Sequence, residues 1–325
     1  MKRFIKAIGA ITTAVLCAPL AAQNYPVKPV TVVIPYPPGG VDLVARLIQP
    51  SIEQELGQPW IIEYKPGASG QIGMEYVSRA RPDGYTLLYT SSNPWVVTPV
   101  MRPKTPYDPI KDFTPITNTT EGVNLIVAGT QFPPNNFRET LDYAKKNPSK
   151  VSWATSGLGS FWHLDAENMN RLAGTDILHV PFAGFGPMLP AMYSGQVSMN
   201  LITYQVVRPL IESGKVKALA IMNSEGKAKH LFPKGVEIIS DVLPGFVMGA
   251  SWNGVGGPAN LPRPIVQRVN QAVHKALSQK DLVDRLTRDA SFSSANTPEE
   301  FAARIVNDLE HSRTIVRAAK IAPLD

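Results

Sequence analysis

Cysteine is nearly absent from this sequence. Cys17 is the only cysteine among 325 residues, and it lies in an amino-terminal segment that we expect to be removed. Lipid attachment there is disfavoured, because the preceding Leu16 is bulky where a lipidation signal has a small residue. A mature chain without thiols excludes disulfides, cysteine nucleophiles and thiolate metal sites.

Long apolar runs and basic clusters are absent as well. After residue 22, no segment reaches the roughly 18 apolar residues that a membrane-spanning helix needs. The net charge of +6 falls to +3 once the three positive charges of the first 22 residues are removed. The remaining lysines and arginines are scattered, which excludes a nucleic-acid footprint, and the mild positive charge weakly favours anionic ligands.

Motifs for nucleotide binding and catalysis are also missing. Gly157-x-Gly159 has Trp162 at the position of the third glycine of a dinucleotide loop, and no loop ends in Gly-Lys-Ser/Thr. Ser160 and His163 would lie close together on a helix, but no acidic residue is placed to orient the histidine.

Metal ligation is disfavoured on the same grounds. His163, Asp165 and His179 match no recognised metal-ligand spacing, so structural histidines are the simpler interpretation. We therefore predict a protein without catalytic residues, metal or cofactor.

The first 22 residues have the three parts of a secretory signal peptide. Lys2, Arg3 and Lys6 precede an apolar run over 7–18, and small residues up to Ala22 provide a cleavage site. The apolar run is too short to span a bilayer comfortably, which disfavours an uncleaved anchor. We therefore expect residues 1–22 to be a signal peptide and the mature chain to be exported.

The mature chain alternates short apolar runs with amphipathic stretches. Residues 30–35 have the continuous apolar pattern of a buried strand, and 41–56 have the pattern of a helix that Pro50 should kink or split. Further elements are predicted at 61–63 (strand), 73–79 (helix) and 85–90 (strand). Such alternation predicts parallel sheets covered by helices on both faces.

The pattern restarts after a proline-rich stretch at 99–115. Strands are predicted at 124–128, 151–155, 177–180, 197–202 and 218–221, and helices at 140–146 and 264–278. Thr297, Pro298 and Glu300 have the spacing of a capping box that opens a last helix. The length and pattern predict two α/β units.

Three glycine-rich loops, at 37–40, 156–160 and 181–186, follow predicted strands and precede predicted helices. The first amides of a helix lack intrahelical partners and carry the positive end of the helix dipole. Glycine lets the backbone approach a ligand, and open sheets bind ligands at the carboxyl ends of their strands. The loops therefore predict an anion site between the units, although a tight turn alone also explains each of them.

Short motifs spread along the whole mature chain add a second line of inference. They are Tyr25-Pro26-x-Lys28-Pro29, Pro35-Tyr36-Pro37-Pro38-Gly39-Gly40 with Asp42, Lys65-Pro66-Gly67-Ala68-Ser69-Gly70, Pro82-Asp83-Gly84-Tyr85-Thr86-Leu87-Leu88, Pro106-Tyr107-Asp108-Pro109, Ser156-Gly157-x-Gly159-Ser160 with His163-Leu164, His179-Val180-Pro181-Phe182 with Gly184, Gly195-Gln196-Val197 and Thr297-Pro298-Glu299-Glu300-Phe301. Together they resemble the tripartite tricarboxylate transporter receptors, also called Bug receptors.

This resemblance implies a two-lobed α/β periplasmic binding protein of type II (Venus flytrap), each lobe a mostly parallel sheet flanked by helices. It implies residues 23–124 and 247–325 for lobe 1 and residues 125–246 for lobe 2. It further implies a monomeric receptor in the periplasm, which captures a small organic anion (a carboxylate) and delivers it to a two-component membrane permease. A membrane sensor kinase is the alternative partner.

The loops and the resemblance together predict ligand contacts in an inter-lobe cleft, made largely by backbone amides and ordered water. The predicted ligand-binding residues are Tyr36, Pro38, Gly39, Gly40, Asp42, Ser69, Ser92, Asn93, Ser156, Gly159, Ser160, His163, Phe182, Ala183, Gly184, Gly186 and Thr203.

Some positions depart from the family pattern and bear on the ligand. Only Val41 separates Gly40 from Asp42, and Ala183 stands where relatives often have a lysine. Asp42 should repel a second ligand carboxylate, and Ala183 offers it no cation. Aromatic side chains that would cover an apolar ligand body are Tyr36, Trp95, Trp162 and Phe182. We therefore hypothesise a small monocarboxylate, aromatic or amino-substituted, rather than a tricarboxylate such as citrate.

Overall fold

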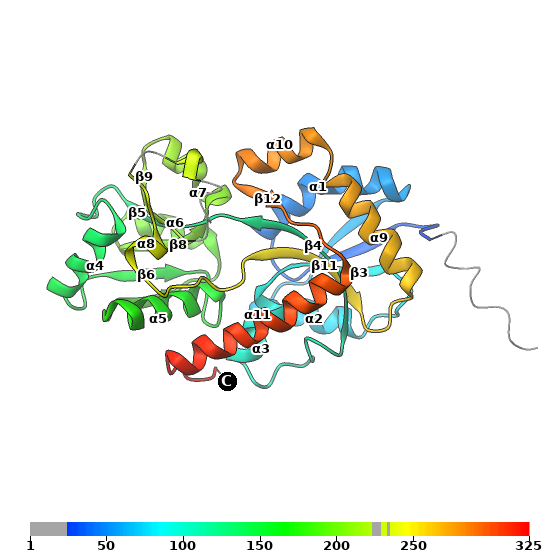
Figure 1. The fold of residues 1–325 in the computed structure, drawn as a ribbon, viewed down its shortest axis with the longest axis horizontal. Helices are drawn as coiled ribbons and strands as arrows, with labels where there is room; N and C mark the ends of the chain where they lie inside the picture. Colours follow the sequence, from blue (N-terminus) through cyan, green and yellow to red (C-terminus); the bar gives the residue numbers. More distant parts are fainter. Residues whose placement is uncertain (1–24, 223–228, 233–234, 325) are drawn as a thin grey trace, which may run out of the picture.

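The computed structural model describes residues 25–222, 229–232 and 235–324, so the predicted signal peptide and its cleavage site lie outside the described residues. Two six-stranded sheets lie side by side, each surrounded by helices (Figure 1). This arrangement confirms the predicted two-lobed α/β fold. Among the described helices, none combines the length and the apolar character that a membrane span requires.

The sheet of the first lobe has the strand order β12-β4-β11-β3-β1-β2. Its strands are β1 (Val30–Ile34), β2 (Trp60–Tyr64), β3 (Thr86–Ser91), β4 (Phe113–Gly122), β11 (Trp252–Pro258) and β12 (Ser291–Ser293). β1 is parallel to β2 and β3, whereas β11 is antiparallel to β3 and β4. The sheet is therefore mixed rather than mostly parallel, because β11 arrives from the other lobe and runs against its neighbours.

The sheet of the second lobe has the order β10-β9-β5-β8-β6-β7 and is mixed for the same reason. Its strands are β5 (Asn124–Gly129), β6 (Ser152–Thr155), β7 (Leu178–Pro181), β8 (Met199–Thr203), β9 (Val216–Ile221) and β10 (Glu237–Ile238). β6 is parallel to β7 and β8, whereas β5, which arrives from the first lobe, is antiparallel to β8 and β9.

Helices cover both sheets. Those of the first lobe are α1 (Val41–Leu56), α2 (Gln71–Ser78), α3 (Thr98–Met101), α9 (Arg263–Ala276), α10 (Lys280–Arg288) and α11 (Pro298–Ala318), with the short turns η1 (Ala68–Gly70) and η2 (Asn93–Val97). Those of the second lobe are α4 (Phe137–Lys146), α5 (Phe161–Ala173), α6 (Phe185–Tyr193), α7 (Tyr204–Glu212) and α8 (Ile239–Val242), with η3 (Lys229–Leu231). The long α11 contacts β4 and η2 in the first lobe and α5 in the second, and runs along both lobes in Figure 1.

The first helix has the bounds that its apolar pattern predicts, but Pro50 does not split it. The buried stripe of α1 includes Val44, Ile48 and Ile52, and it packs against α9. Pro50 lies inside the helix on its exposed side, and the stripe continues beyond it. Packing of the buried face therefore outweighs the loss of one backbone hydrogen bond.

The last helix opens with the predicted capping box. The Thr297 hydroxyl oxygen accepts the Glu300 amide at 3.1 Å, and the Glu300 carboxylate accepts the Thr297 amide at 2.9 Å. These reciprocal bonds satisfy amides that the helix leaves without partners. They fix the start of the helix that connects the two lobes.

The chain passes between the lobes twice, and the two crossovers lie side by side. β4 is followed after one residue by β5, and α8 leads through residues 243–251 back to β11. The Asn124 side-chain amide donates to the Ser251 hydroxyl at 2.7 Å, and the Thr203 hydroxyl donates to the Asn124 side-chain oxygen at 3.2 Å. One hydrophobic cluster also continues from the first lobe to the second, including Trp252 and Trp153.

Candidate functional site

The first glycine loop joins β1 to α1 and presents open backbone. Gly39 and Gly40 have φ of 110° and 57°, in the left-handed region where other residues are strained. Pro38 and Gly39 are exposed, and a Cβ on Gly39 would meet no atom within 4 Å. The Asp42 amide donates to the Gly39 carbonyl at 3.3 Å, so the loop leads directly into the first turn of α1.

The second glycine loop joins β6 to α5. Gly157 and Gly159 have φ of 138° and 73°. Ser160 caps the helix, because its hydroxyl oxygen accepts the His163 amide at 3.2 Å and its hydroxyl donates to the Gly157 carbonyl at 2.7 Å. Ser156 is half-buried at the start of the loop.

The third glycine loop joins β7 to α6. The helix begins at Phe185, earlier than predicted, so Gly186 lies in its first turn. Gly184 has φ of 93° and caps the helix without a side-chain hydrogen bond. Phe182 is half-buried and Ala183 is exposed. The first amides of α6 therefore have no side-chain cap.

The structure brings the three loops together from both lobes. A Cβ on Gly40 would lie 3.5 Å from the ring of Phe185, which connects the first loop to the third. A Cβ on Gly157 would lie 3.5 Å from the Phe182 carbonyl, which connects the second loop to the third. Amino ends of helices from both lobes thus surround one region, as a site for an anion requires.

Asn93 connects the first lobe to α5, and Ser92 connects it to the returning crossover. The Asn93 side-chain oxygen accepts the Phe161 amide at 3.0 Å, at the start of α5. The Ser92 hydroxyl donates to the Ala250 carbonyl at 2.5 Å in the returning crossover. These polar groups are used by the protein itself, as is the Thr203 hydroxyl described above.

Tyr36 and Ser69 flank the first loop. The Tyr36 hydroxyl lies 2.9 Å from the Ser91 hydroxyl, and burial raises the pKa of Tyr36 to about 12, so the phenol stays neutral. Ser69 is half-buried with φ of 56° in η1. A Cβ on the adjacent Gly70 would lie 3.6 Å from Pro35, at the end of β1.

Asp42 is not the free anion that the sequence hypothesis assumed. The Tyr64 hydroxyl donates to its carboxylate at 2.5 Å, and the Arg46 guanidinium lies 3.0 Å away. Only 5% of Asp42 is exposed. Its charge is therefore paired within the protein, which weakens the premise that it repels a second ligand carboxylate.

Trp95 and Trp162 are core residues and not ligand covers. Trp95 is fully buried against Phe113, Trp252 and Phe301. Trp162 is 2% exposed and packs against the rings of Phe161 and Phe185 in tilted and edge-on arrangements. Of the four aromatic residues proposed to cover a ligand, Tyr36 and Phe182 retain partly open surfaces next to the loops.

Comparison with known proteins assigns the family. The family of tripartite tricarboxylate transporter receptors matches residues 44–321. The chain belongs to this family. BugT of Bordetella pertussis is 29% identical over 320 residues, which are 98% of this chain and 97% of BugT.

Two solved structures show the same fold with carboxylates. Rpa4515 of R. palustris with adipate has 27% identity and a TM-score of 0.86, over 92% of this chain and 100% of that one. MatC of Rhodopseudomonas palustris with bound malate has 34% identity and a TM-score of 0.80, over 90% of this chain and 100% of that one.

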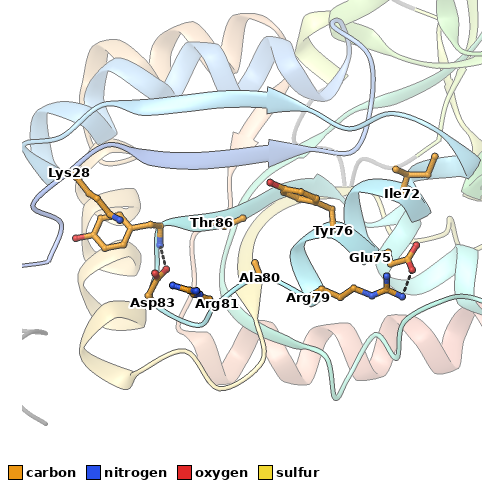
Figure 2. Close-up of a pocket in the computed structure, with 10 residues that line it drawn as sticks. Lys28, Ile72, Glu75, Tyr76, Arg79, Ala80, Arg81, Asp83 and Thr86 are labelled. Carbon is orange, nitrogen blue, oxygen red and sulfur yellow. Dashed lines mark hydrogen bonds and ion pairs between the residues drawn. The ribbon is translucent and has the colours of Figure 1, made fainter.

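An open groove of about 680 Å³ on this receptor lies away from the three loops (Figure 2). Lys28 and Asp83 lie at one end of it, and Glu75 and Arg79 form an ion pair nearer the other end. Lys28 precedes β1 and Tyr85 precedes β3, so this end of the groove lies at the amino ends of these strands. Ligands of such sheets bind at the opposite, carboxyl ends, where the loops lie.

Sequence reasoning missed Arg46, Tyr64 and His179 as parts of the site. Arg46 lies four residues after Asp42 on α1, so helical spacing was a signal for that pair. Tyr64 gave no such signal, and His179 was weighed only as a metal ligand, because each reaches the site through pairing of parallel strands. β2 brings Tyr64 beside the end of β1, and β7 brings His179 beside β6.

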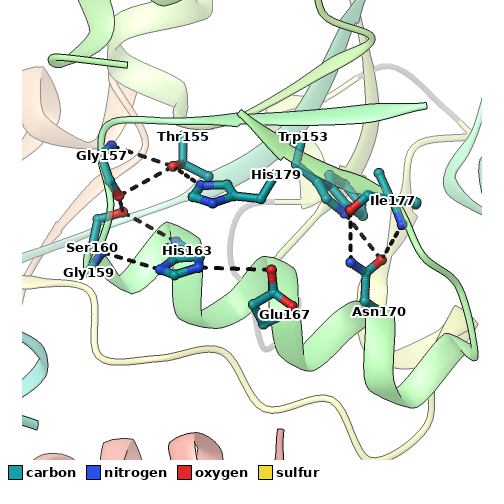
Figure 3. A network of polar contacts seen from close by, with 10 residues as sticks. All are labelled: Trp153, Thr155, Gly157, Gly159, Ser160, His163, Glu167, Asn170, Ile177 and His179. Atoms are coloured by element: carbon teal, nitrogen blue, oxygen red, sulfur yellow. Dashed lines mark hydrogen bonds and ion pairs between the residues drawn. The ribbon is translucent and has the colours of Figure 1, made fainter. Parts of the chain in front are cut away.

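Both ring nitrogens of His163 face other groups of the protein (Figure 3). The Gly159 amide donates to Nδ1 at 3.2 Å, and Nε2 lies 3.9 Å from the Glu167 carboxylate. Only 7% of His163 is exposed, and burial lowers its pKa. His163 therefore supports the second loop by accepting the hydrogen bond of the Gly159 amide.

Proposed function

We propose that this receptor captures a small carboxylate between its lobes and delivers it to a tripartite-type membrane permease, without catalysing a reaction. The observation that carries the proposal is the convergence of three glycine loops at helix amino ends from both lobes. Such ends attract anions, and no side chain caps α1 or α6, which follow the first and third loops. Membership of the receptor family supports the role in transport.

We further propose export to the periplasm as a monomer, with residues 23–124 and 247–325 in lobe 1 and 125–246 in lobe 2. The strands support this division to within one residue, because β1–β4, β11 and β12 share one sheet and β5–β10, which begin at Asn124, share the other. Exposed loop backbone at Pro38, Gly39, Ala183 and Gly186 is placed to contact the ligand. The buried Ser92 and His163 are placed to shape the loops instead.

As ligand, we place small dicarboxylates ahead of the monocarboxylates of the sequence hypothesis. The compensated charge of Asp42 no longer opposes a second carboxylate. The solved relatives hold adipate and malate, both dicarboxylates. Ala183 still offers no cation, so backbone amides and water would hold the second carboxylate.

Isothermal titration calorimetry with malate, adipate, benzoate and citrate tests this proposal. We expect one carboxylate to bind per chain without turnover. Absence of binding by all four acids would argue against a carboxylate receptor of this kind.

A glycine variant tests the site itself. Gly39→Leu should weaken binding by roughly tenfold or more, about 1.4 kcal/mol, because the side chain blocks backbone approach. Gly235→Leu is the matched control, since Gly235 also has a left-handed φ, 103°, and no atom within 4 Å of its Cβ position. It precedes β10, an edge strand at the opposite side of the sheet from β7. Equal affinities of the two variants would place the anion elsewhere.

A further inference from the structure

Two stacked histidines lie beside the second loop (Figure 3). His163 belongs to α5 and His179 to β7, and their ring centroids are 4.2 Å apart with planes 11° from parallel. The second loop joins β6 to α5, which carries His163. The third loop joins β7, which carries His179, to α6. The two histidines therefore lie on elements that adjoin the second and third loops.

Each ring holds one end of the second loop. The Gly159 amide donates to His163 Nδ1 at 3.2 Å, so this nitrogen carries no proton and the proton of the neutral ring lies on Nε2. His179 Nε2 lies 2.6 Å from the Thr155 hydroxyl, which is also 3.5 Å from the Gly157 amide. The hydrogen bond from the Gly159 amide thus requires an unprotonated Nδ1 on His163.

A divalent cation fits this cluster poorly, although His163, Glu167 and His179 offer ligand atoms within 4.8 Å of one another. A metal on His163 Nε2 would move the ring proton to Nδ1, where the Gly159 amide already donates. Two nearly parallel rings also direct their in-plane lone pairs alongside each other rather than at one point. Hydrogen bonding therefore accounts for the cluster better.

We propose that His163 is a proton-sensitive positioning residue, whose neutral ring holds the Gly159 amide in place for ligand binding and whose protonation at Nδ1 releases it. The proposal rests on the proposed function in one respect, that the second loop contributes to the carboxylate site. No bond is formed or broken, and the only exchange is one proton with solvent.

The charged groups around the pair set the direction of the effect. Burial lowers the pKa of His163, and burial with the neighbouring His163 lowers the pKa of His179 to about 4. Glu167 on the same helix favours a proton on His163, and its own pKa is raised by burial and by Asp176. From the first lobe, Arg102 Nε lies 4.0 Å from the Cβ position of Gly159 and opposes a further positive charge.

These groups define the pH window of the effect. Both rings are neutral at pH 7 and above, because both pKa values lie below the usual 6.5. The proposed protonation of His163 therefore takes place below pH 6.5.

Nuclear magnetic resonance of the ligand-free protein tests the positioning step. The titration runs from pH 8 to pH 5. At pH 8 we expect the ring nitrogens of His163 to show the Nε2–H form. We expect the Gly159 amide resonance to shift with the same midpoint as the ring. A proton on Nδ1 at pH 8, or a Gly159 amide that does not follow the ring, would overturn the proposal.

Calorimetry with malate and adipate between pH 5.5 and 8 tests the consequence. Wild type should lose up to roughly tenfold in affinity per pH unit below the ring midpoint. His163→Asn keeps an acceptor near the Nδ1 position but cannot titrate, so its affinity should change only as the ligand itself titrates. His274→Asn, which removes a histidine of α9, should keep the wild-type slope.

Two outcomes of calorimetry would overturn the proposal. One is an identical slope in wild type and His163→Asn. The other is an affinity that rises as the pH falls, because the imidazolium would then contact the carboxylate directly. If neither acid binds, the proposed ligand class fails, whereas the resonance titration still decides the role of His163.

Discussion

The buried carboxyl group of Asp165 offers a test of how the returning crossover is stabilised. Asp165 lies on α5 and is fully buried, and one of its oxygens accepts the Gly249 amide at 2.9 Å. Its other oxygen has no hydrogen-bond partner within the described part of the chain. Gly249 belongs to the segment that leads from the second lobe back to the first, so this bond fixes the crossover to α5.

Burial favours the neutral acid and sets the sign of the pH dependence. It raises the pKa of Asp165 to about 8 from 3.8, although the Gly249 amide acts in the opposite direction. Between these values the folded protein holds a proton that the unfolded chain has lost. Stability from this group is therefore complete below pH 3.8 and is lost as the pH rises to about 8.

The expected magnitude follows from this difference. Each pH unit within the window costs up to about 1.4 kcal/mol, so the loss at pH 7 approaches about 4 kcal/mol. Asp165→Asn removes the titration and keeps an oxygen for the Gly249 amide. Its new amide group lacks a partner, which costs about 1–3 kcal/mol, so we expect a net gain on the order of 1–3 kcal/mol at pH 7.

Urea unfolding at pH 4.5, 6, 7 and 8 measures this difference. The advantage of Asp165→Asn over wild type should grow with pH and disappear near pH 4.5. Asp241→Asn, an exposed position on α8, should show no such trend. A difference between Asp165→Asn and wild type that is constant across pH would refute the assigned pKa shift.

Two further variants test the packing and the support of Asp42. Tyr64→Phe removes the hydroxyl that bridges Asp42 and Arg46, and should lower the free energy of unfolding by about 1 kcal/mol in urea melts; an unchanged midpoint would mean that Arg46 alone suffices. Phe301→Ala empties the space beside Trp252 and should cost about 3–5 kcal/mol, whereas Val306→Ala on the exposed side of α11 should stay within about 0.5 kcal/mol. Equal losses in these two variants would show that α11 is not held by its buried face.

Local patterns in the sequence were sufficient for several elements of the fold. The apolar spacing of α1 gives its bounds, and the residues from Thr297 to Glu300 give the start of α11. Both depend on neighbours within a few residues along the chain. The three glycine loops are local in the same sense, since each is a strand end, a turn and a helix start.

β11 could not be predicted, because long-range packing determines it. Its sequence contains Gly254, Gly256 and Gly257, which alone indicate a loop. In the structure Phe301 occupies the space beside Gly254 and Trp95 the space beside Gly256, since Cβ atoms there would lie 2.4 and 2.5 Å from these rings. The glycines therefore permit large side chains from other elements to pack on the sheet. β11 also makes the sheet mixed, because it runs antiparallel to β3 and β4.

The hydrogen-bond partner of Asp42 depends on strand register, which the sequence does not reveal. Ile34 pairs with Tyr64 across parallel strands, and this register brings the phenol to Asp42 just beyond the first loop. From the sequence alone, without the Tyr64 hydroxyl, Asp42 is expected to be a free anion, and its charge favours a monocarboxylate ligand. With it, the loops present amides beside a compensated charge, so a second carboxylate meets no net repulsion from Asp42. Strand register in the first sheet therefore removes the argument against a second carboxylate, on which the proposed dicarboxylate ligand depends.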